Sequence, residues 1–262
     1  MSFKIGDFVT RESYNNDTVF KIIKIEEEVA VLKGVNVRLY ADSALGDLQR
    51  VDNIKSLDKD DRRLLEKVND MINLDRSEFF YLPGKILHID GDQDYLERCM
   101  RFYKNINVRA YGLKLKENEI CLEIEKYLNE LNPDIVVITG HDAYNKRLGD
   151  KKEINSYRNS RNFVKAINVA RKYEKSQDKL IIIAGACQSF YEDLIKAGAN
   201  FASSPKRINI HALDPAIIAS SIALSEKNKN IDLISIIEKT KYGSDGIGGI
   251  ITNGTMYVGY PR

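Results

Sequence analysis

The sequence predicts an α/β protein in which a parallel sheet covered by helices follows a small all-β domain. From residue 85 onwards, short apolar runs alternate with segments of helical periodicity, which is typical of a parallel sheet. Before residue 53, short β-rich runs are separated by Gly, Asn and Asp, which is typical of a small SH3-like β-barrel. We therefore expect a barrel over residues 1–52, a connecting helix or linker over 53–82 and the α/β domain over 83–262.

The amino-terminal domain is expected to consist of short strands followed by one helix. We expect strands at 8–9, 19–25, 29–32 and 35–40, and a charged helix within 53–78. Because about fifty residues bury little apolar surface, we expect this domain to depend on its neighbour for stability.

The α/β domain is expected to alternate strands and helices until its last hairpin. We expect strands at 86–89, 108–115, 135–138, 180–184 and 199–202, and helices at 93–103, 119–131, 163–173, 189–197, 215–224 and 233–240. Residues 247–252 and 255–260 flank Asn253-Gly254, the favoured two-residue turn, and are predicted to form a hairpin.

Composition excludes several classes of protein. A net charge of +2 over 262 residues gives no sign of a nucleic-acid binder. No apolar stretch approaches the roughly 18 residues of a membrane span, and the first residues lack the features of a secretory signal. Three scattered cysteines do not form a disulfide framework, so a reducing, cytoplasm-like compartment is expected. We expect no metal and no other cofactor.

Two residues after consecutive strands predict a catalytic pair. The strand at 135–138 runs into Gly140-His141, and the strand at 180–184 runs into Ala186-Cys187. In open parallel sheets, functional sites form beyond the carboxyl ends of the strands, so both side chains should lie over one edge. Their separation of 46 residues is close to the roughly 50 of caspase-type proteases. We predict a cysteine protease with Cys187 as nucleophile and His141 as general base.

The surroundings of Cys187 favour a reactive thiol. The predicted helix at 189–197 would begin beside it, and Ser189 with Glu192 forms a possible capping box. A helix start and a nearby imidazole both lower a thiol pKa. Cys99, Cys121 and His88 are assigned to packing. His211 is a second candidate base.

Six ordered segments, spread over nearly the whole chain, also carry a resemblance to a known family. They are Gly6-Asp7-Phe8-Val9-Thr10-Arg11, Leu32-Lys33-Gly34, Arg38-Leu39-Tyr40-Ala41-Asp42-Ser43, Lys85-Ile86-Leu87-His88-Ile89-Asp90-Gly91-Asp92, Val137-Ile138-Thr139-Gly140-His141-Asp142 and Ala184-Gly185-Ala186-Cys187-Gln188-Ser189. With these segments the chain resembles the YabG family of sporulation-specific proteases.

The resemblance implies an endopeptidase that processes spore-coat and germination-related proteins by cleavage after Arg, in the mother-cell cytoplasm or the developing spore coat. The family's catalytic pair maps onto His141 and Cys187. The wider likeness is to caspase- and clostripain-like folds, but Asp142 replaces the Gly expected after the base. The acidic residue expected two positions before the nucleophile is also missing, because that position is Gly185.

Further roles follow if the chain cleaves after Arg. We expect the backbone amides of Cys187 and of a residue near Gly140 to bind the oxyanion. A buried guanidinium needs a carboxylate, and the candidates are Asp214, Asp245 and Asp142, of which we favour Asp214. Asp214 is equally well placed to cap the following helix. The basic loop at 143–160 is expected to be mobile and is a possible site of self-cleavage.

Two other functions remain open from the residues alone. Asp90, Asp92 and Asp94 follow the first strand of the α/β domain, as in a response-regulator receiver. A receiver also needs a phosphoacceptor after its third strand, where only a displaced Asp142 is available, and it leaves Cys187 without a role. Capping of the next helix by Asp92 is the simpler interpretation of the acidic cluster. A non-catalytic spore-coat scaffold is the third possibility, and a thiol inert towards iodoacetamide would favour it.

Overall fold

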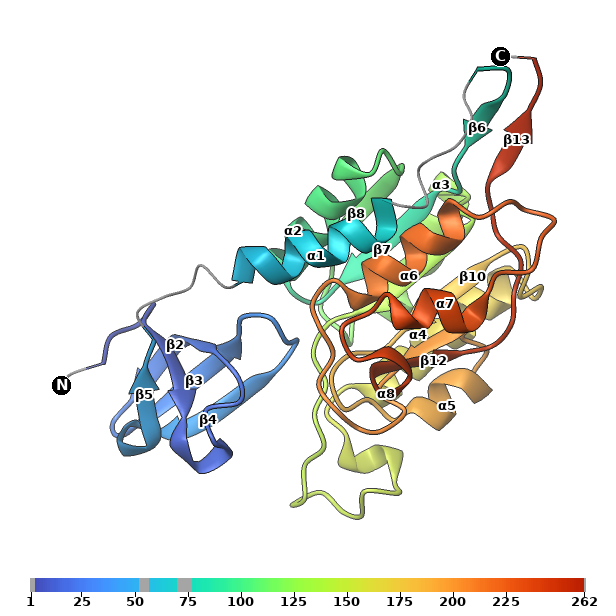
Figure 1. Cartoon of the computed structure of the whole chain (residues 1–262). Coiled ribbons are helices and arrows are strands. Elements are labelled where there is room, and N and C mark those ends of the chain that lie inside the picture. The colour runs from blue at the N-terminus through green and yellow to red at the C-terminus, as the bar shows by residue number, and fades with distance from the viewer. Residues whose placement is uncertain (1–2, 52–56, 70–76, 262) are drawn as a thin grey trace.

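The computed structural model describes residues 3–51, 57–69 and 77–261. An amino-terminal sheet lies beside a larger unit in which helices cover both faces of a central sheet (Figure 1). The predicted α/β unit with parallel strands is confirmed, as is the β-rich amino-terminal part. In the described part of the chain, no helix is long and apolar enough to cross a membrane.

The amino-terminal sheet is antiparallel throughout and has five strands. In spatial order they are β4 (Tyr40–Ala44), β3 (Val29–Gly34), β2 (Phe20–Glu26), β1 (Phe8–Arg11) and β5 (Leu48–Arg50). One face is apolar, because Phe20, Ile22, Ala30 and Leu32 alternate with exposed residues and are fully buried. Such alternation is what a sheet with one buried face requires.

The strand predicted at 35–40 is wrong for most of its length. Strand β4 begins only at Tyr40, and residues 35–39 form a loop that leaves the sheet. Within that loop Val37 forms an isolated antiparallel bridge with His211 of the larger unit. The β-branched residues of this segment therefore pair with another part of the chain instead of extending their own sheet.

The central sheet has six strands and supplies the edge on which the candidate site lies. In spatial order they are β12 (Ile247–Gly249), β11 (Phe201–Ser203), β10 (Ile181–Ala184), β9 (Ile135–Thr139), β7 (Ile86–Asp90) and β8 (Ala110–Lys114). All neighbours run parallel except β12, which pairs antiparallel with β11. Strands β7, β9 and β10 are fully buried, as expected for parallel strands covered on both faces.

Alternate strand residues face two separate helical layers. One layer contains α1 (Leu57–Asn69), α2 (Gln93–Asn105), α6 (Asp214–Ala223) and α7 (Leu233–Glu238). The other contains α3 (Ile120–Leu131), α4 (Ser160–Tyr173) and α5 (Tyr191–Lys196). Every residue of α6 is buried, and its second residue is Pro215, which is well tolerated at a helix start. Figure 1 shows α6 and α7 on the viewer's side of the sheet.

The predicted carboxyl-terminal hairpin does not form. The short helix α8 (Gly243–Gly246) leads into β12, which takes the free edge of β11. Strand β13 (Tyr257–Gly259) pairs instead with β6 (Phe80–Leu82), and Asn253 forms a bridge with Asn230. The Asn-Gly pair favours a local turn, but β12 and β13 each pair with another strand and not with each other.

The amino-terminal sheet shares its core with the larger unit. Val37, Leu39 and the apolar face of the sheet form one buried cluster with Cys187 and Ile210. This contact agrees with the expectation that fifty residues depend on their neighbour. It also places the predicted nucleophile at the boundary between the two parts of the protein.

Candidate active site

The two predicted catalytic residues follow neighbouring strands. β9 ends at Thr139 and β10 at Ala184, and the two strands pair in parallel along their whole length. His141 and Cys187 come two and three residues after these ends. The hydroxyl of Thr139 donates a hydrogen bond to the carbonyl of Gly185 (2.8 Å), which ties the two loops together. The predicted adjacency of the two strands is therefore confirmed.

The main chain around His141 is held from both sides. Its amide donates to Oε1 of Glu117 (2.8 Å), and its carbonyl accepts from Nδ2 of Asn159 (2.8 Å). A Cβ atom at Gly140 would lie 2.4 Å from Oε1 of Glu117, so a larger residue there would displace the carboxylate that binds the His141 amide. These contacts fix the direction in which the imidazole leaves the sheet edge.

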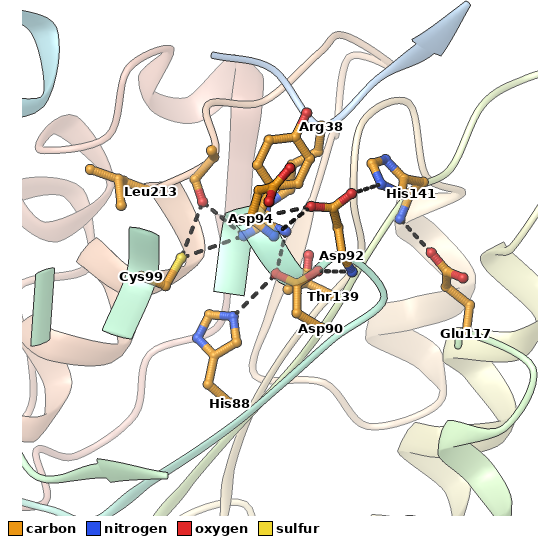
Figure 2. Close-up of polar contacts among 12 residues, drawn as sticks. Arg38, His88, Asp90, Asp92, Asp94, Cys99, Glu117, Thr139, His141 and Leu213 are labelled. Atoms are coloured by element: carbon orange, nitrogen blue, oxygen red, sulfur yellow. Dashed lines mark hydrogen bonds and ion pairs between the residues drawn. The ribbon is translucent and has the colours of Figure 1, made fainter. Parts of the chain in front are cut away.

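The imidazole of His141 binds a carboxylate through one nitrogen only. Nε2 lies 3.1 Å from Oδ2 of Asp92, whereas Nδ1 is buried and has no hydrogen-bond partner among the described residues (Figure 2). The ring centroids of Tyr40 and Tyr95 lie 4.1 and 5.5 Å from that of His141. Asp92 also accepts hydrogen bonds from the amides of Asp94 and Tyr95, which confirms that it caps α2.

Asp92 is an ionised carboxylate with a cation beside it. Nζ of Lys33, from strand β3, lies 2.7 Å from Asp92 and 2.6 Å from Asp94. Burial by itself would raise the pKa of Asp92, but hydrogen bonds from His141 and Lys33 lower it well below its usual range. The same carboxylates outweigh burial at Lys33 and raise its pKa. An ionised Asp92 can only accept, so it holds the proton of the neutral imidazole on Nε2.

The thiol of Cys187 is fully buried. Its sulfur accepts from the amide of Ile210 (3.3 Å) and points to the carbonyl of the same residue (3.7 Å). Burial raises the pKa of Cys187 to about 12, although backbone hydrogen bonds from Ile210 and Arg38 lower it. The thiol is therefore protonated at neutral pH in this arrangement.

The helix expected to start beside Cys187 starts later. α5 begins at Tyr191, and the hydroxyl of Ser189 accepts from the amide of Ala186 (2.9 Å) instead of capping it. The predicted capping box with Glu192 is thus wrong, and the helix start cannot lower the thiol pKa. Ser189 instead closes a tight turn around Cys187.

The two predicted catalytic side chains do not hydrogen-bond each other in the described structure. Nε2 of His141 faces Asp92, while the Cys187 sulfur faces Ile210. The ring of Tyr95 lies beside that of His141, with 5.5 Å between the ring centroids. Direct transfer of the thiol proton to His141 would require a rearrangement at this edge.

The structure adds Arg38, which the sequence analysis did not single out. Its side chain is fully buried, with Nη1 2.5 Å from Oδ2 of Asp90 and Nη2 2.9 Å from the carbonyl of Ala212 (Figure 2). Nη2 also lies 3.5 Å from the Cys99 sulfur. No local pattern marks an arginine that binds a strand end 52 residues away.

Asp142, one of the predicted substrate carboxylates, joins loops together. Its carboxylate accepts from the amide of Asn159 (2.7 Å) and from the hydroxyls of Ser160 and Ser189. It is buried, and burial raises its pKa to about 6 although the hydrogen bonds lower it. A phosphoacceptor must be reachable by its phosphodonor, so this environment speaks against the receiver interpretation.

The raised pKa of Asp142 predicts a pH-dependent stability. The folded value of about 6 lies above the ordinary 3.8, so its stabilising contribution is complete below about pH 4. That contribution is lost as pH rises through about 6, by an amount on the order of 3 kcal/mol. In Asp142→Asn, we expect Tm to exceed the wild-type value at pH 7 and the difference to vanish near pH 4.

Thermal melts from pH 4 to pH 7 check this expectation, and Asp178→Asn is a matched control at an exposed carboxylate. The control should follow the wild-type curve. Parallel curves for Asp142→Asn and wild type would contradict the assigned pKa shift.

The other predicted carboxylates and the alternative base occupy different places. Asp214 is fully buried and accepts from the amides of His211 (2.8 Å) and Lys241 (2.9 Å), and burial raises its pKa to about 6. Asp245 is exposed. Burial lowers the pKa of His211 to about 3, so this residue is a poor base. His88 and Cys99 are buried packing residues, as predicted.

The loop at 143–160 contains ordered contacts at its two ends. Tyr144 and Tyr157 form an antiparallel bridge, and the amide of Asn145 donates to the carbonyl of Ser156 (2.8 Å). The tip, residues 145–153, is exposed. Within the ranges that the structure describes, no group of three or more His, Cys, Asp or Glu side chains is arranged to hold a metal ion.

Two comparisons with known proteins identify the same family. The model of the family described as YabG peptidase U57 matches residues 4–261. The chain is 41% identical over 286 residues to a curated protein of Bacillus subtilis (strain 168), named sporulation-specific protease YabG, and covers 99% of it. Among solved structures, a ureidoglycine–glyoxylate aminotransferase of Bacillus subtilis matches with a TM-score of 0.27 at 11% identity. That match covers 54% of this chain and 38% of the other, and the TM-score is too low to bear on the fold.

Proposed function

Because the chain belongs to the YabG peptidase family, we propose that it is a sporulation-associated cysteine endopeptidase with Cys187 as nucleophile and His141 as acid–base. The observation that carries this proposal is the placement of both residues on the loops after neighbouring strands β9 and β10. Unrelated proteases use such a thiol–imidazole pair, because the imidazole accepts the proton that the thiol must lose to become a nucleophile. A caspase-like topology and an SH3-like closure of the amino-terminal sheet belong to the same proposal.

The geometry supports a definite division of roles. With Nε2 bonded to Asp92, the second nitrogen of His141 can accept the thiol proton and later give it to the leaving amine. The thiolate would attack the scissile carbonyl, and the amide of Cys187 would bind the resulting oxyanion. Since the amide of His141 is engaged by Glu117, the second donor is assigned to Gly140.

The proposed substrates are those that the family resemblance implies. We propose cleavage after Arg in spore-coat and germination-related proteins, in the mother cell or the developing spore coat. Self-cleavage within the basic loop at 143–160 is part of this proposal, and intact-mass analysis of purified wild-type protein would detect it.

The specificity is tested with two peptides that differ only at P1, one carrying Arg and the other its neutral isostere citrulline. We expect kcat/KM to favour Arg by at least about 100-fold, because a buried carboxylate is left unpaired when the cation is missing. Cys187→Ala should hydrolyse neither peptide. Equal rates for the two peptides would overturn cleavage after Arg, and hydrolysis that survives in Cys187→Ala would overturn the cysteine mechanism.

A further inference from the structure

The loop between β3 and β4 pairs with the larger unit through its main chain. Val37 forms an antiparallel bridge with His211, and the amide of Ala212 donates to the carbonyl of Asn36 (2.9 Å). The hydroxyl of Tyr95 donates to the carbonyl of Val37 (2.8 Å). Main-chain pairing of this kind is how proteins commonly bind an extended peptide, whatever its side chains.

The residue after Val37 places a guanidinium in a pocket of the larger unit. Arg38 is fully buried, and its charge is matched by Asp90 at the carboxyl end of β7. The carbonyl of Ala212 takes a second hydrogen bond, and the ring centroid of Tyr95 lies 5.0 Å from the guanidinium carbon. A buried guanidinium without such partners would be strongly unfavourable. The pocket therefore supplies a carboxylate and a carbonyl to the two terminal nitrogens of an arginine side chain, while Nε of Arg38 has no partner among the described residues.

The main chain on both sides of Arg38 meets the two proposed catalytic residues. Val37 and Leu39, on either side of Arg38, are buried in one cluster with Cys187, and the backbone of Arg38 lies close enough to lower the pKa of that thiol. Two residues later, the ring of Tyr40 contacts that of His141 in a tilted arrangement, with 52° between the ring planes. The order is that of a protease substrate, with a side chain in the specificity pocket, the main chain at the nucleophile and the following residues beside the base.

The segment does not continue as an extended peptide beyond Arg38. The amide of Leu39 donates to the carbonyl of Val37 (2.9 Å), which closes a three-residue turn with Arg38 at its tip. Both Leu39 and Cys187 are buried in the cluster that joins the two parts of the protein. An incoming peptide cannot reach the thiol or the pocket while this segment is in place.

We propose that residues 36–40 occupy the substrate groove as an internal inhibitory segment, and that Asp90 is the carboxylate that selects Arg at P1. This inference rests on the proposed protease function and identifies its specificity pocket and its resting state. Asp90 takes the role first given to Asp214, whose two oxygens are engaged by the amides of His211 and Lys241. Lys33 forms an ion pair with Asp92, and the ring of Tyr40 packs against His141, so both side chains also cover the base.

The inhibitory role is tested by Arg38→Ala in the full-length chain, with the Arg and citrulline peptides as substrates. If only a fraction of the wild type is open, its kcat/KM is that fraction of the value for the fully open enzyme. We therefore expect Arg38→Ala to raise kcat/KM for the Arg peptide by at least about tenfold. Arg50→Ala is the matched control, since Arg50 pairs with Asp7 at the surface of the same sheet, and it should leave kcat/KM unchanged.

Arg38→Lys keeps a cation beside Asp90. It replaces Arg38→Ala in this test if that variant does not unfold cooperatively on heating. It should raise kcat/KM by a smaller factor, because an ammonium cannot reproduce the planar contacts of a guanidinium. A folded Arg38 variant with unchanged or lower activity on the Arg peptide would overturn the inhibitory role.

The pocket is tested by adding Asp90→Asn to Arg38→Ala, which removes both charges of the buried pair. We expect the ratio of kcat/KM for Arg over citrulline to fall by at least about 100-fold. Adding Asp214→Asn to Arg38→Ala should instead change both peptides alike. If the ratio is unchanged while hydrolysis still depends on Cys187, only the assignment of Asp90 is overturned. Failure of every folded variant to hydrolyse either peptide would overturn the proposed protease function, and this inference with it.

Discussion

Replacing Cys187 by alanine is expected to lower kcat for peptide hydrolysis by about 10⁴–10⁶-fold, because nucleophile and base act as one unit. His141→Ala should cost about as much, since without the base the buried thiol stays protonated. The double variant should be no slower than either single variant. Steady-state rates on an Arg peptide, corrected for folded protein by thermal melts, measure all three.

Cys121→Ala is the matched control for loss of a thiol. Cys121 lies partly buried in α3 and its sulfur points to the carbonyl of Asn118, not to His141 or Cys187, so this variant should retain wild-type kcat. Additive losses in the double variant would show that Cys187 and His141 contribute independently, contrary to the proposed mechanism.

Asp92→Asn is expected to lower kcat by about 10²–10⁴-fold with little change in KM. Asp92 holds the imidazole proton on Nε2 and so leaves Nδ1 of His141 able to accept the thiol proton. An asparagine amide can also donate, which permits the opposite tautomer and the wrong ring orientation. Asparagine caps helices as well as aspartate does, so α2 should keep its start.

Asp94→Asn separates this effect from loss of the contact with Lys33. Both carboxylates bind that lysine, but only Asp92 contacts His141. Asp94 is exposed, so its substitution should change kcat by no more than about threefold. We also expect the pH profile of kcat to shift in Asp92→Asn and not in Asp94→Asn. Equal kcat losses in the two variants would show that Asp92 acts only through Lys33.

The sequence alone determined the order of strands and helices in the larger unit. Residues 135–138 are apolar without interruption, and such a short run is typical of a strand covered on both faces. The same reasoning placed His141 and Cys187 on neighbouring loops, because consecutive strands of a parallel sheet commonly pair. Capping of α2 by Asp92 was also readable, since it depends on residues within one helical turn.

Signals from a few residues failed where a distant partner was available. The turn at Asn253-Gly254 lost to pairing of β12 with β11 and of β13 with β6. Val37 bridged to His211 and did not extend β4. In each case a distant segment satisfied backbone groups that the local pattern had assigned to a neighbour.

The tertiary structure alone decided the state of the candidate site. Burial of Cys187, the engagement of Asp214 by backbone amides and the ion pair of Arg38 with Asp90 all join residues far apart in the chain. Periodicity and turn signals extend over a few residues, so they carry no information about which distant side chain fills a pocket. The pKa of a thiol or carboxyl depends on burial and on the nearest charges, and these exist only once the two parts of the chain have packed together.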